Sequence, residues 1–154
     1  MMIDLSFSPD PECDFPRSGR KKALELVSEM DLRYGYFEAD ITFRVSGADF
    51  FQPAGKFPLI DFMFTLAYSV LGIRDSGIGE IDFTESSNWI RVEQCEDVLT
   101  FRNKLGDKNG TCSVVEYVSA VKAFIESGIT DTVSRHPQMA GHPTLLKLSH
   151  LPIT

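Results

Sequence analysis

Basic residues are scarce in this chain of 154 residues: 15 Lys and Arg stand against 22 Asp and Glu, for a formal net charge of -7. Proteins that bind nucleic acids neutralise phosphates with a basic face, so this balance disfavours a nucleic acid as partner. Cysteine is scarce as well, and Cys13, Cys95 and Cys112 show no paired spacing. We therefore expect free thiols and no disulfide framework.

The chain also lacks a long uninterrupted apolar run. Residues 57–73 form the most apolar stretch, but they include Pro58 and Asp61 and are too short and too polar for a membrane span. Residues 1–8 contain neither the basic region nor the apolar core of a secretory signal. These absences predict a cytoplasmic protein with no membrane partner.

Signatures of catalysis are missing too. No G-x-S-x-G motif is present, and residues 77–79 lack the lysine and the strand–loop–helix context of a phosphate-binding loop. His136, His142 and His150 lie close together in the sequence, but their spacing differs from that of zinc ligands, and no acidic or cysteine ligand is near. We expect no metal, no cofactor and no enzymatic activity.

Two residues keep an alternative open. Asp61 lies in the most apolar stretch, where a catalytic role competes with simple stabilisation by a helix N-terminus. Cys112 could act as a nucleophile only if a histidine of the C-terminal segment folds back beside it. The alternative functions are thus a small enzyme or ligand-binding domain, and a self-associating scaffold protein.

Alternation of apolar and polar residues predicts strands in both acidic parts of the chain. From Phe37 to Val45 every second residue is apolar, which is typical of a half-buried strand. Residues 46–49 supply a turn, after which residues 50–52 could return as a short strand. Residues 81–84, 90–93 and 98–102 alternate in the same way and predict an antiparallel meander.

Two long helices are expected. One begins with Pro58 at its first position, is apolar on almost every side and ends near Gly72. The other begins after Ser113, which forms a capping-box pattern with Glu116, and Gly128 is a stop or a kink in it. Residues 18–34 are read as a helix or an irregular lead-in, and residues 144–148 as a short helix.

Together these elements predict an α+β fold, with one antiparallel sheet of about 4–6 strands and two main helices packed on one of its faces. A chain of 154 residues is long enough to bury a sizeable core without a metal or disulfide. We expect a single domain over residues 1–154, with residues 1–35 as a lead-in segment and residues 136–154 as a tail packed on the body.

The acidic residues are concentrated in two of the predicted strand regions. Residues 23–49 contain six acids and two bases, and residues 75–97 contain seven acids and one base. A negative sheet face with aromatic anchors would attract a basic partner; otherwise it is a solvated face and Trp89 fills the core. The candidate partner-binding residues are Glu38, Asp40, Asp82, Glu85, Trp89, Glu93, Glu96 and Asp97.

Three segments also carry a resemblance: residues 37–47, residues 57–61 with the apolar helix that follows, and residues 82–86 ahead of the strand at 89–92. Over residues 36–126 the chain resembles a family of small, uncharacterised bacterial domains, and it is similar in build to immunity proteins of contact-dependent and polymorphic toxin systems. The resemblance implies a cytoplasmic, non-catalytic protein that binds and neutralises one cognate toxin, often a basic nuclease. It transfers no functional residue by position. We expect a monomer, although the sequence leaves the oligomeric state open.

Overall fold

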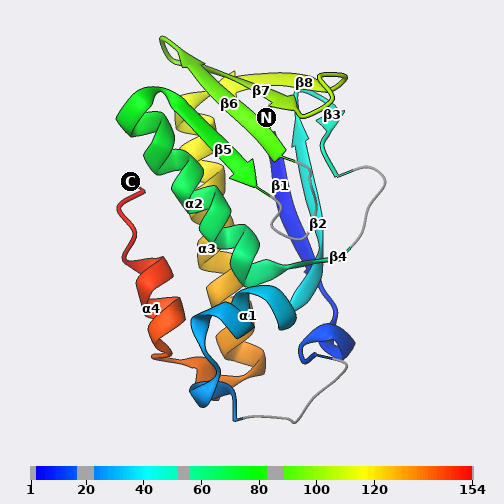
Figure 1. Cartoon of the computed structure of the whole chain (residues 1–154), viewed down its shortest axis with the longest axis vertical. Helices are drawn as coiled ribbons and strands as arrows, with labels where there is room; N and C mark the ends of the chain where they lie inside the picture. Colours follow the sequence, from blue (N-terminus) through cyan, green and yellow to red (C-terminus); the bar gives the residue numbers. More distant parts are fainter. Residues whose placement is uncertain (1–2, 17–22, 52–55, 83–88, 154) are drawn as a thin grey trace.

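The computed structural model describes residues 3–16, 23–51, 56–82 and 89–153, which form an α+β fold with two antiparallel sheets (Figure 1). The first sheet consists of β1 (Ile3–Pro9), β2 (Glu38–Val45), β3 (Ala48–Asp49) and β4 (Lys56–Pro58). The second sheet consists of β5 (Ile78–Asp82), β6 (Trp89–Cys95), β7 (Val98–Asn103) and β8 (Asn109–Ser113).

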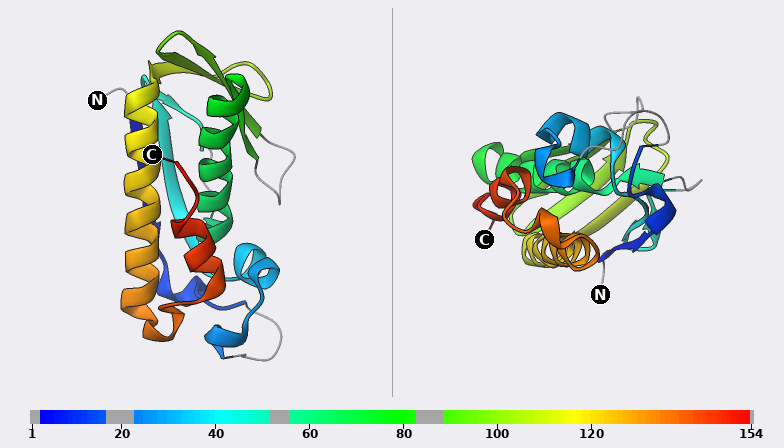
Figure 2. Two further views of the ribbon diagram at one scale, coloured as in Figure 1. Left: turned by 90° about the vertical axis from the view of Figure 1, so that its left-hand side faces the viewer. Right: turned by 90° about the horizontal axis from the view of Figure 1, so that it is seen from below.

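Two long helices, α2 (Leu59–Ser76) and α3 (Val114–Arg135), run in opposite directions beside the sheets (Figure 1). The shorter helices are α1 (Glu29–Gly35) and α4 (Pro143–Ser149). Single 3-10 turns are η1 (Pro11–Cys13), η2 (Leu24–Leu26) and η3 (Pro137–Met139). Two further views show α4, in red, against the side of the long helices that faces away from β1 and β2 (Figure 2).

The expected single sheet is therefore two sheets of four strands. After β4 the chain enters α2, whose 18 residues extend over roughly 27 Å at 1.5 Å per residue. The helix carries the chain to the other end of the molecule, where β5–β8 form a separate sheet within the described part of the chain. The separation of the sheets thus follows from the length of the helix between them.

The first sheet is completed by β1, in a segment for which the sequence predicts only a lead-in. β1 pairs antiparallel with β2 along its whole length, from Ile3 opposite Val45 to Pro9 opposite Ala39. β2 itself is the predicted strand: its apolar residues are buried, and the residues between them are exposed or half-buried. The predicted return strand at residues 50–52 is wrong, because β3 already ends at Asp49 and Phe51 is buried in the turn after it; residue 52 lies outside the described ranges.

The two long helices differ from prediction at their ends. Pro58 belongs to β4 and is the N-terminal cap of α2. The helix continues past Gly72 to Ser76, and Gly77, which caps its C-terminal end, has a left-handed conformation with φ of 79°. Gly72 is needed for a different reason: a Cβ atom there would lie 2.8 Å from the carbonyl oxygen of Ile78. Likewise α3 passes through Gly128 without a break, and a Cβ atom at this position would meet the flexible thioether of Met63 in α2.

The core lies between the helices and the inner faces of both sheets. Phe101 of β7 links the layers, because its ring centroid lies 5.9 Å from that of Phe43 in β2 and 5.1 Å from that of Tyr117 in α3. At the end of β2, the hydroxyl of Ser46 donates to the carbonyl oxygen of Thr111 at 2.5 Å and accepts from its N–H at 3.2 Å. The second sheet is thereby fixed to the end of the first.

Candidate functional site

The predicted acidic surface is divided between the two sheets. Glu38 and Asp40 lie in β2 of the first sheet, whereas Asp82, Trp89 and Glu93 lie in β5 and β6 of the second. Glu96 and Asp97 follow in the tight connection between β6 and β7. Glu85 lies outside the described residues. The strands do not pair with each other, so the structure contains two acidic regions.

The acidic region of the first sheet is partly compensated by a lysine. Lys56 Nζ lies 3.0 Å from an Asp40 carboxylate oxygen and 3.2 Å from an Asp10 carboxylate oxygen. Hydrogen bonds to Asp40 and Asp10 raise the pKa of Lys56, and the hydrogen bond from Lys56 is the main cause that lowers the pKa of Asp10. This region therefore presents a mixed-charge bridge on the surface.

The outer face of the second sheet is the other acidic region, and it carries two arginines among its acids. Alternate residues of its strands point to this face and are exposed or half-buried: Ile78, Glu80, Asp82, Trp89, Arg91, Glu93, Val98, Thr100, Arg102 and Thr111. Asp82 lies opposite Trp89, and Glu80 lies opposite Arg91. The acidic residues of this face lie in β5 and β6. Of its two arginines, Arg91 lies in β6 and donates to Glu93 at 2.9 Å, and Arg102 lies in β7. Such a face can attract cations and offer an aromatic anchor.

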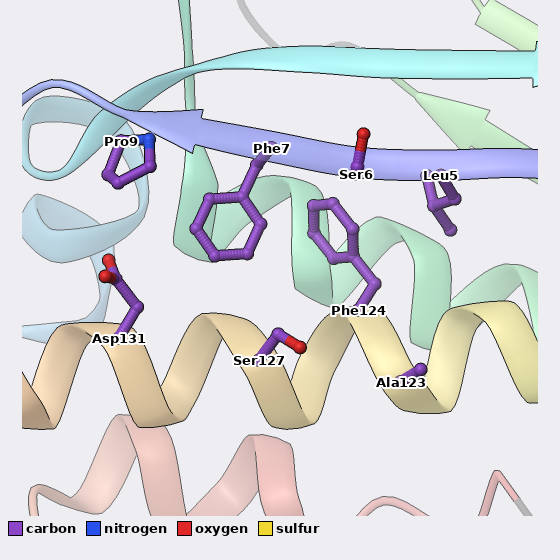
Figure 3. A pocket seen from close by; sticks show the side chains of 8 residues that line it. All are labelled: Leu5, Ser6, Phe7, Pro9, Ala123, Phe124, Ser127 and Asp131. Atoms are coloured by element: carbon purple, nitrogen blue, oxygen red, sulfur yellow. The ribbon is translucent and has the colours of Figure 1, made fainter.

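A groove runs along β1 and α3 (Figure 3). It has a volume of about 380 Å³ and is lined by Leu5, Ser6, Phe7, Pro9, Ala123, Phe124, Ser127 and Asp131. Phe7 and Phe124 meet edge to face in its floor, with ring centroids 5.3 Å apart. A second hollow on α3 shares Ser127 and Asp131 with it and adds Glu126. The groove can hold a chain segment or an elongated ligand against the strand.

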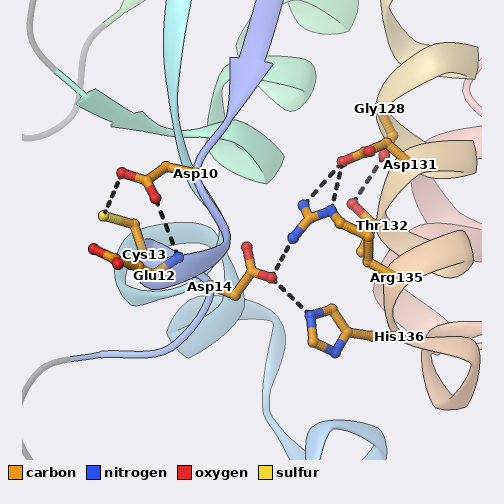
Figure 4. A network of polar contacts seen from close by, with 9 residues as sticks. All are labelled: Asp10, Glu12, Cys13, Asp14, Gly128, Asp131, Thr132, Arg135 and His136. Carbon is orange, nitrogen blue, oxygen red and sulfur yellow. Dashed lines mark hydrogen bonds and ion pairs between the residues drawn. The ribbon is translucent and has the colours of Figure 1, made fainter.

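A buried polar network ties the N-terminal part of the chain to the end of α3 (Figure 4). The Asp14 carboxylate is 5% exposed and accepts hydrogen bonds from Arg135 and, at 2.7 Å, from Nε2 of His136. Arg135 also donates to Asp131 at 2.9 Å. Burial by itself lowers the pKa of Arg135, but the bonds to Asp14 and Asp131 outweigh it and raise the pKa. The ring of His136 packs against Phe15, with centroids 5.6 Å apart.

A carboxylate that orients a histidine is one component of acid–base catalysis. The closest thiol in the network, that of Cys13, points toward Asp10 and away from His136 (Figure 4), and lies 3.5 Å from an Asp10 oxygen. Burial, followed by the hydrogen bond to Asp10, raises the pKa of Cys13, which opposes formation of a nucleophilic thiolate. The arrangement is therefore better explained by the packing of the N-terminal segment than by a catalytic role of these residues.

The other candidate catalytic residues lie in different elements, Asp61 in α2 and Cys112 in β8. Asp61 binds Arg33, with Nη2 to Oδ1 at 2.8 Å. Cys112 is buried in β8, and burial, with a contribution from the charge of Glu116, raises the pKa of its thiol to about 12.

The histidines of the C-terminal segment do not meet Cys112 either. His142 caps α4 by accepting the N–H of Thr144 at 3.0 Å, so its other ring nitrogen donates to the carbonyl oxygen of Val27 at 2.9 Å. The ring of His150 contacts the carbonyl oxygen of Leu146. The structure thus ties His142 to the N-terminal part of the chain and gives His150 a contact with the helix that it caps.

The described residues contain no group of three or more His, Cys, Asp or Glu side chains arranged to hold a metal ion. None of the helices among them is both long enough and apolar enough to cross a bilayer.

Sequence reasoning missed the groove and the Asp14 network. The signal for β1 was present, because Ile3, Leu5 and Phe7 alternate with polar residues. For Asp14 and Arg135 no local signal exists, since 121 positions separate them in the sequence. Their pairing depends on the tertiary fold.

Comparisons were made with protein-family models, with curated proteins and with solved structures. None of the three finds a match to this chain.

Proposed function

We propose that the protein is an immunity protein: a non-catalytic binder that neutralises a cognate bacterial toxin by covering its working surface. The observation that carries the proposal is the outer face of the second sheet. Glu80, Asp82 and Glu93 project from two adjacent strands, and Trp89 is half-buried opposite Asp82. Glu96 and Asp97 extend the negative charge into the next turn.

This face combines the two contributions that a fast and specific binder needs. Clustered carboxylates attract a basic partner and raise the association rate. Tryptophan is a frequent energetic anchor at interfaces, and Ile78 and Val98, which are 40% and 42% exposed, add apolar contact area. A basic substrate-binding surface, such as that of a nuclease, is the natural target, and occluding it would block the toxin without any chemical step.

The first test is protection of cells. The protein is co-expressed with a candidate toxin, such as one encoded by an adjacent gene, and survival is compared with that of cells carrying the toxin alone. We expect restored growth and a stable complex on size-exclusion chromatography. Undiminished killing by a toxin that is expressed and active contradicts the proposal.

The second test locates the surface. The double variant D82K/E93K is compared with D75K/E12K, which changes the net charge equally at exposed positions outside this face. We expect D82K/E93K to slow association with the toxin and to flatten its dependence on ionic strength, since exposed charges steer encounter. Equal effects of the two variants would show that only net charge matters and would move the interface elsewhere.

A further inference from the structure

The strand β1 has a free edge. Among the strands that the structure describes, β1 pairs only with β2, while β3 and β4 both lie on the opposite side of β2. Within the described part of the chain, the backbone of residues 4–8 makes no hydrogen bond outside the β1–β2 ladder. Because an antiparallel pair uses only alternate backbone groups of each strand, the remaining N–H and C=O groups of β1 point outward.

Proteins usually protect such an edge with charges, proline or a covering element. Here Pro9 ends the strand, and Asp4 is its only charged residue, with its carboxylate 3.8 Å from Arg44 of β2. Ser6, Phe7 and Ser8 between them carry no charge. The central part of the edge is thus open to another strand.

The groove of Figure 3 lies along this edge. Its lining includes the consecutive residues Leu5, Ser6 and Phe7. Successive side chains of a strand point to opposite faces, so a groove lined by three residues in a row also contacts the backbone of β1 between Leu5 and Phe7. On its other side are Ala123, Phe124 and Ser127 of α3, two of which have small side chains that leave room for a chain.

The charge of the groove favours a basic occupant. Asp131 and Glu126 are the ionisable residues that line it and the adjoining hollow, and no Lys or Arg is among the lining residues. Asp131 already accepts from Arg135, whereas Glu126 is exposed on α3. A lysine or arginine of a bound segment would find its counter-charge at this end.

We infer that the groove binds an extended, basic segment of a partner protein, which adds to β1 as a further strand of the first sheet. Backbone hydrogen bonds to the free edge hold the segment. Its apolar side chains pack on Leu5, Phe7 and Phe124, and a basic side chain reaches Glu126. The inference does not rest on the toxin proposal, since the groove and the outer face of the second sheet are different surfaces.

The test uses the whole protein and a defined probe, a seven-residue peptide of alternating lysine and valine. Titration up to about 2 mM, a range that detects millimolar affinity, is followed by the backbone amide signals in nuclear magnetic resonance. We expect shifts in residues 4–8 and around Ser127. The same peptide methylated on alternate backbone nitrogens should bind about tenfold more weakly or worse, because it cannot complete the strand hydrogen bonds.

Matched variants distinguish the effect of filling the groove from that of a substitution elsewhere on α3. Ser127 and Ser119 are both exposed on α3, but only Ser127 lines the groove. S127F should weaken peptide binding about tenfold by filling the groove, while S119F should leave it unchanged. E126K should weaken binding of the lysine peptide. The same variant should strengthen binding of a peptide that has glutamate in place of lysine.

Three results would overturn the inference: no shifts in β1, equal binding of the methylated peptide, or equal effects of S127F and S119F. Dimerisation of the protein alone that S127F abolishes would assign the edge to a second copy, and would overturn it as well. Peptide binding in a protein that fails to protect against the toxin would leave this inference standing and reject only the proposed function.

Discussion

Gly110 in β8 lies directly against the backbone of Val45 in β2, and this contact joins the two sheets. A Cβ atom at position 110 would collide with the carbonyl group of Val45, so the approach of the two backbones requires glycine. The hydrogen bonds between Ser46 and Thr111 lie beside it. The junction fixes how the outer face of the second sheet is presented.

Replacing this glycine should therefore destabilise the protein. G110A adds one methyl group at a contact formed by backbone, which cannot move aside as a flexible side chain can. We expect a loss of about 2 kcal/mol in the free energy of unfolding, measured by urea denaturation. The matched control is G35A at the end of α1, where the nearest atom, in Pro16, lies 4.0 Å away. It should be neutral or stabilise by up to about 1 kcal/mol, and equal effects of both would contradict the prediction.

The pair Arg33 and Asp61 joins α1 to α2. Asp61 is 6% exposed, and the guanidinium carbon of Arg33 lies 4.7 Å from the ring centroid of Phe64. Among the described residues, D61A would leave this partly buried cation with Glu29, 3.6 Å away, as its remaining counter-charge. We expect a loss of about 3 kcal/mol in thermal or urea unfolding. The exposed acid Asp75 is the control, since D75A should change stability by less than about 0.5 kcal/mol.

If Asp61 served catalysis and only weakly served the fold, D61A would be as stable as D75A. That outcome would contradict a structural role for Asp61. The two roles that the sequence allows for it, a carboxylate stabilised by the helix N-terminus and a catalytic carboxylate, would then both be open again.

The Asp14 network makes a related prediction for the N-terminal segment. D14A removes the acceptor shared by Arg135 and His136, and we expect it to lower the free energy of unfolding by about 2 kcal/mol. E12A, at an exposed position two residues earlier, should have little effect. In a double-mutant cycle, D14A and H136A should show a coupling of about 1 kcal/mol. Additive effects would mean that the contact contributes nothing to stability.

Much of the fold was predictable from local patterns. The alternation in residues 37–45 predicted β2, and the capping box at Ser113 predicted the start of α3, where both of its hydrogen bonds are present. These predictions succeed because side-chain period and capping depend on neighbours in the sequence. The α+β class follows from the same elements.

The arrangement of those elements was not predictable in the same way. Two sheets rather than one result from the length of α2 and from the close contact of Gly110 with Val45, which are tertiary facts. The acidic residues were identified in the sequence, but whether β2 and β6 share a face depends on strand order. The groove was missed because it requires β1 to lie beside α3, more than a hundred residues later in the chain.

Stability at alkaline pH should depend on Cys112. Burial is the main cause that raises the pKa of its thiol from an ordinary value of 9.0 to about 12, and Glu116 adds to it. Above pH 9 the unfolded chain releases this proton while the folded protein retains it. The free energy of unfolding should therefore fall as the pH rises from about 9 toward about 12, by at most about 1.4 kcal/mol per pH unit for one proton.

The measurement is urea denaturation of the wild type, C112A and C95A at several values between about pH 8 and pH 11, a range set by the pKa of the unfolded and the folded thiol. C112A is expected to be less stable at every pH, because Cys112 packs in the core, so the slope with pH is the quantity to compare. Burial also raises the pKa of Tyr117, with its hydrogen bond to Ser69 opposing the shift and the charge of Cys112 adding to it. The burial contribution of Tyr117 should remain in every variant. C112A should thus have a shallower slope than the wild type, while C95A, altered at an exposed thiol, should keep the wild-type slope. A C112A slope equal to that of the wild type would show that the buried thiol does not titrate with unfolding.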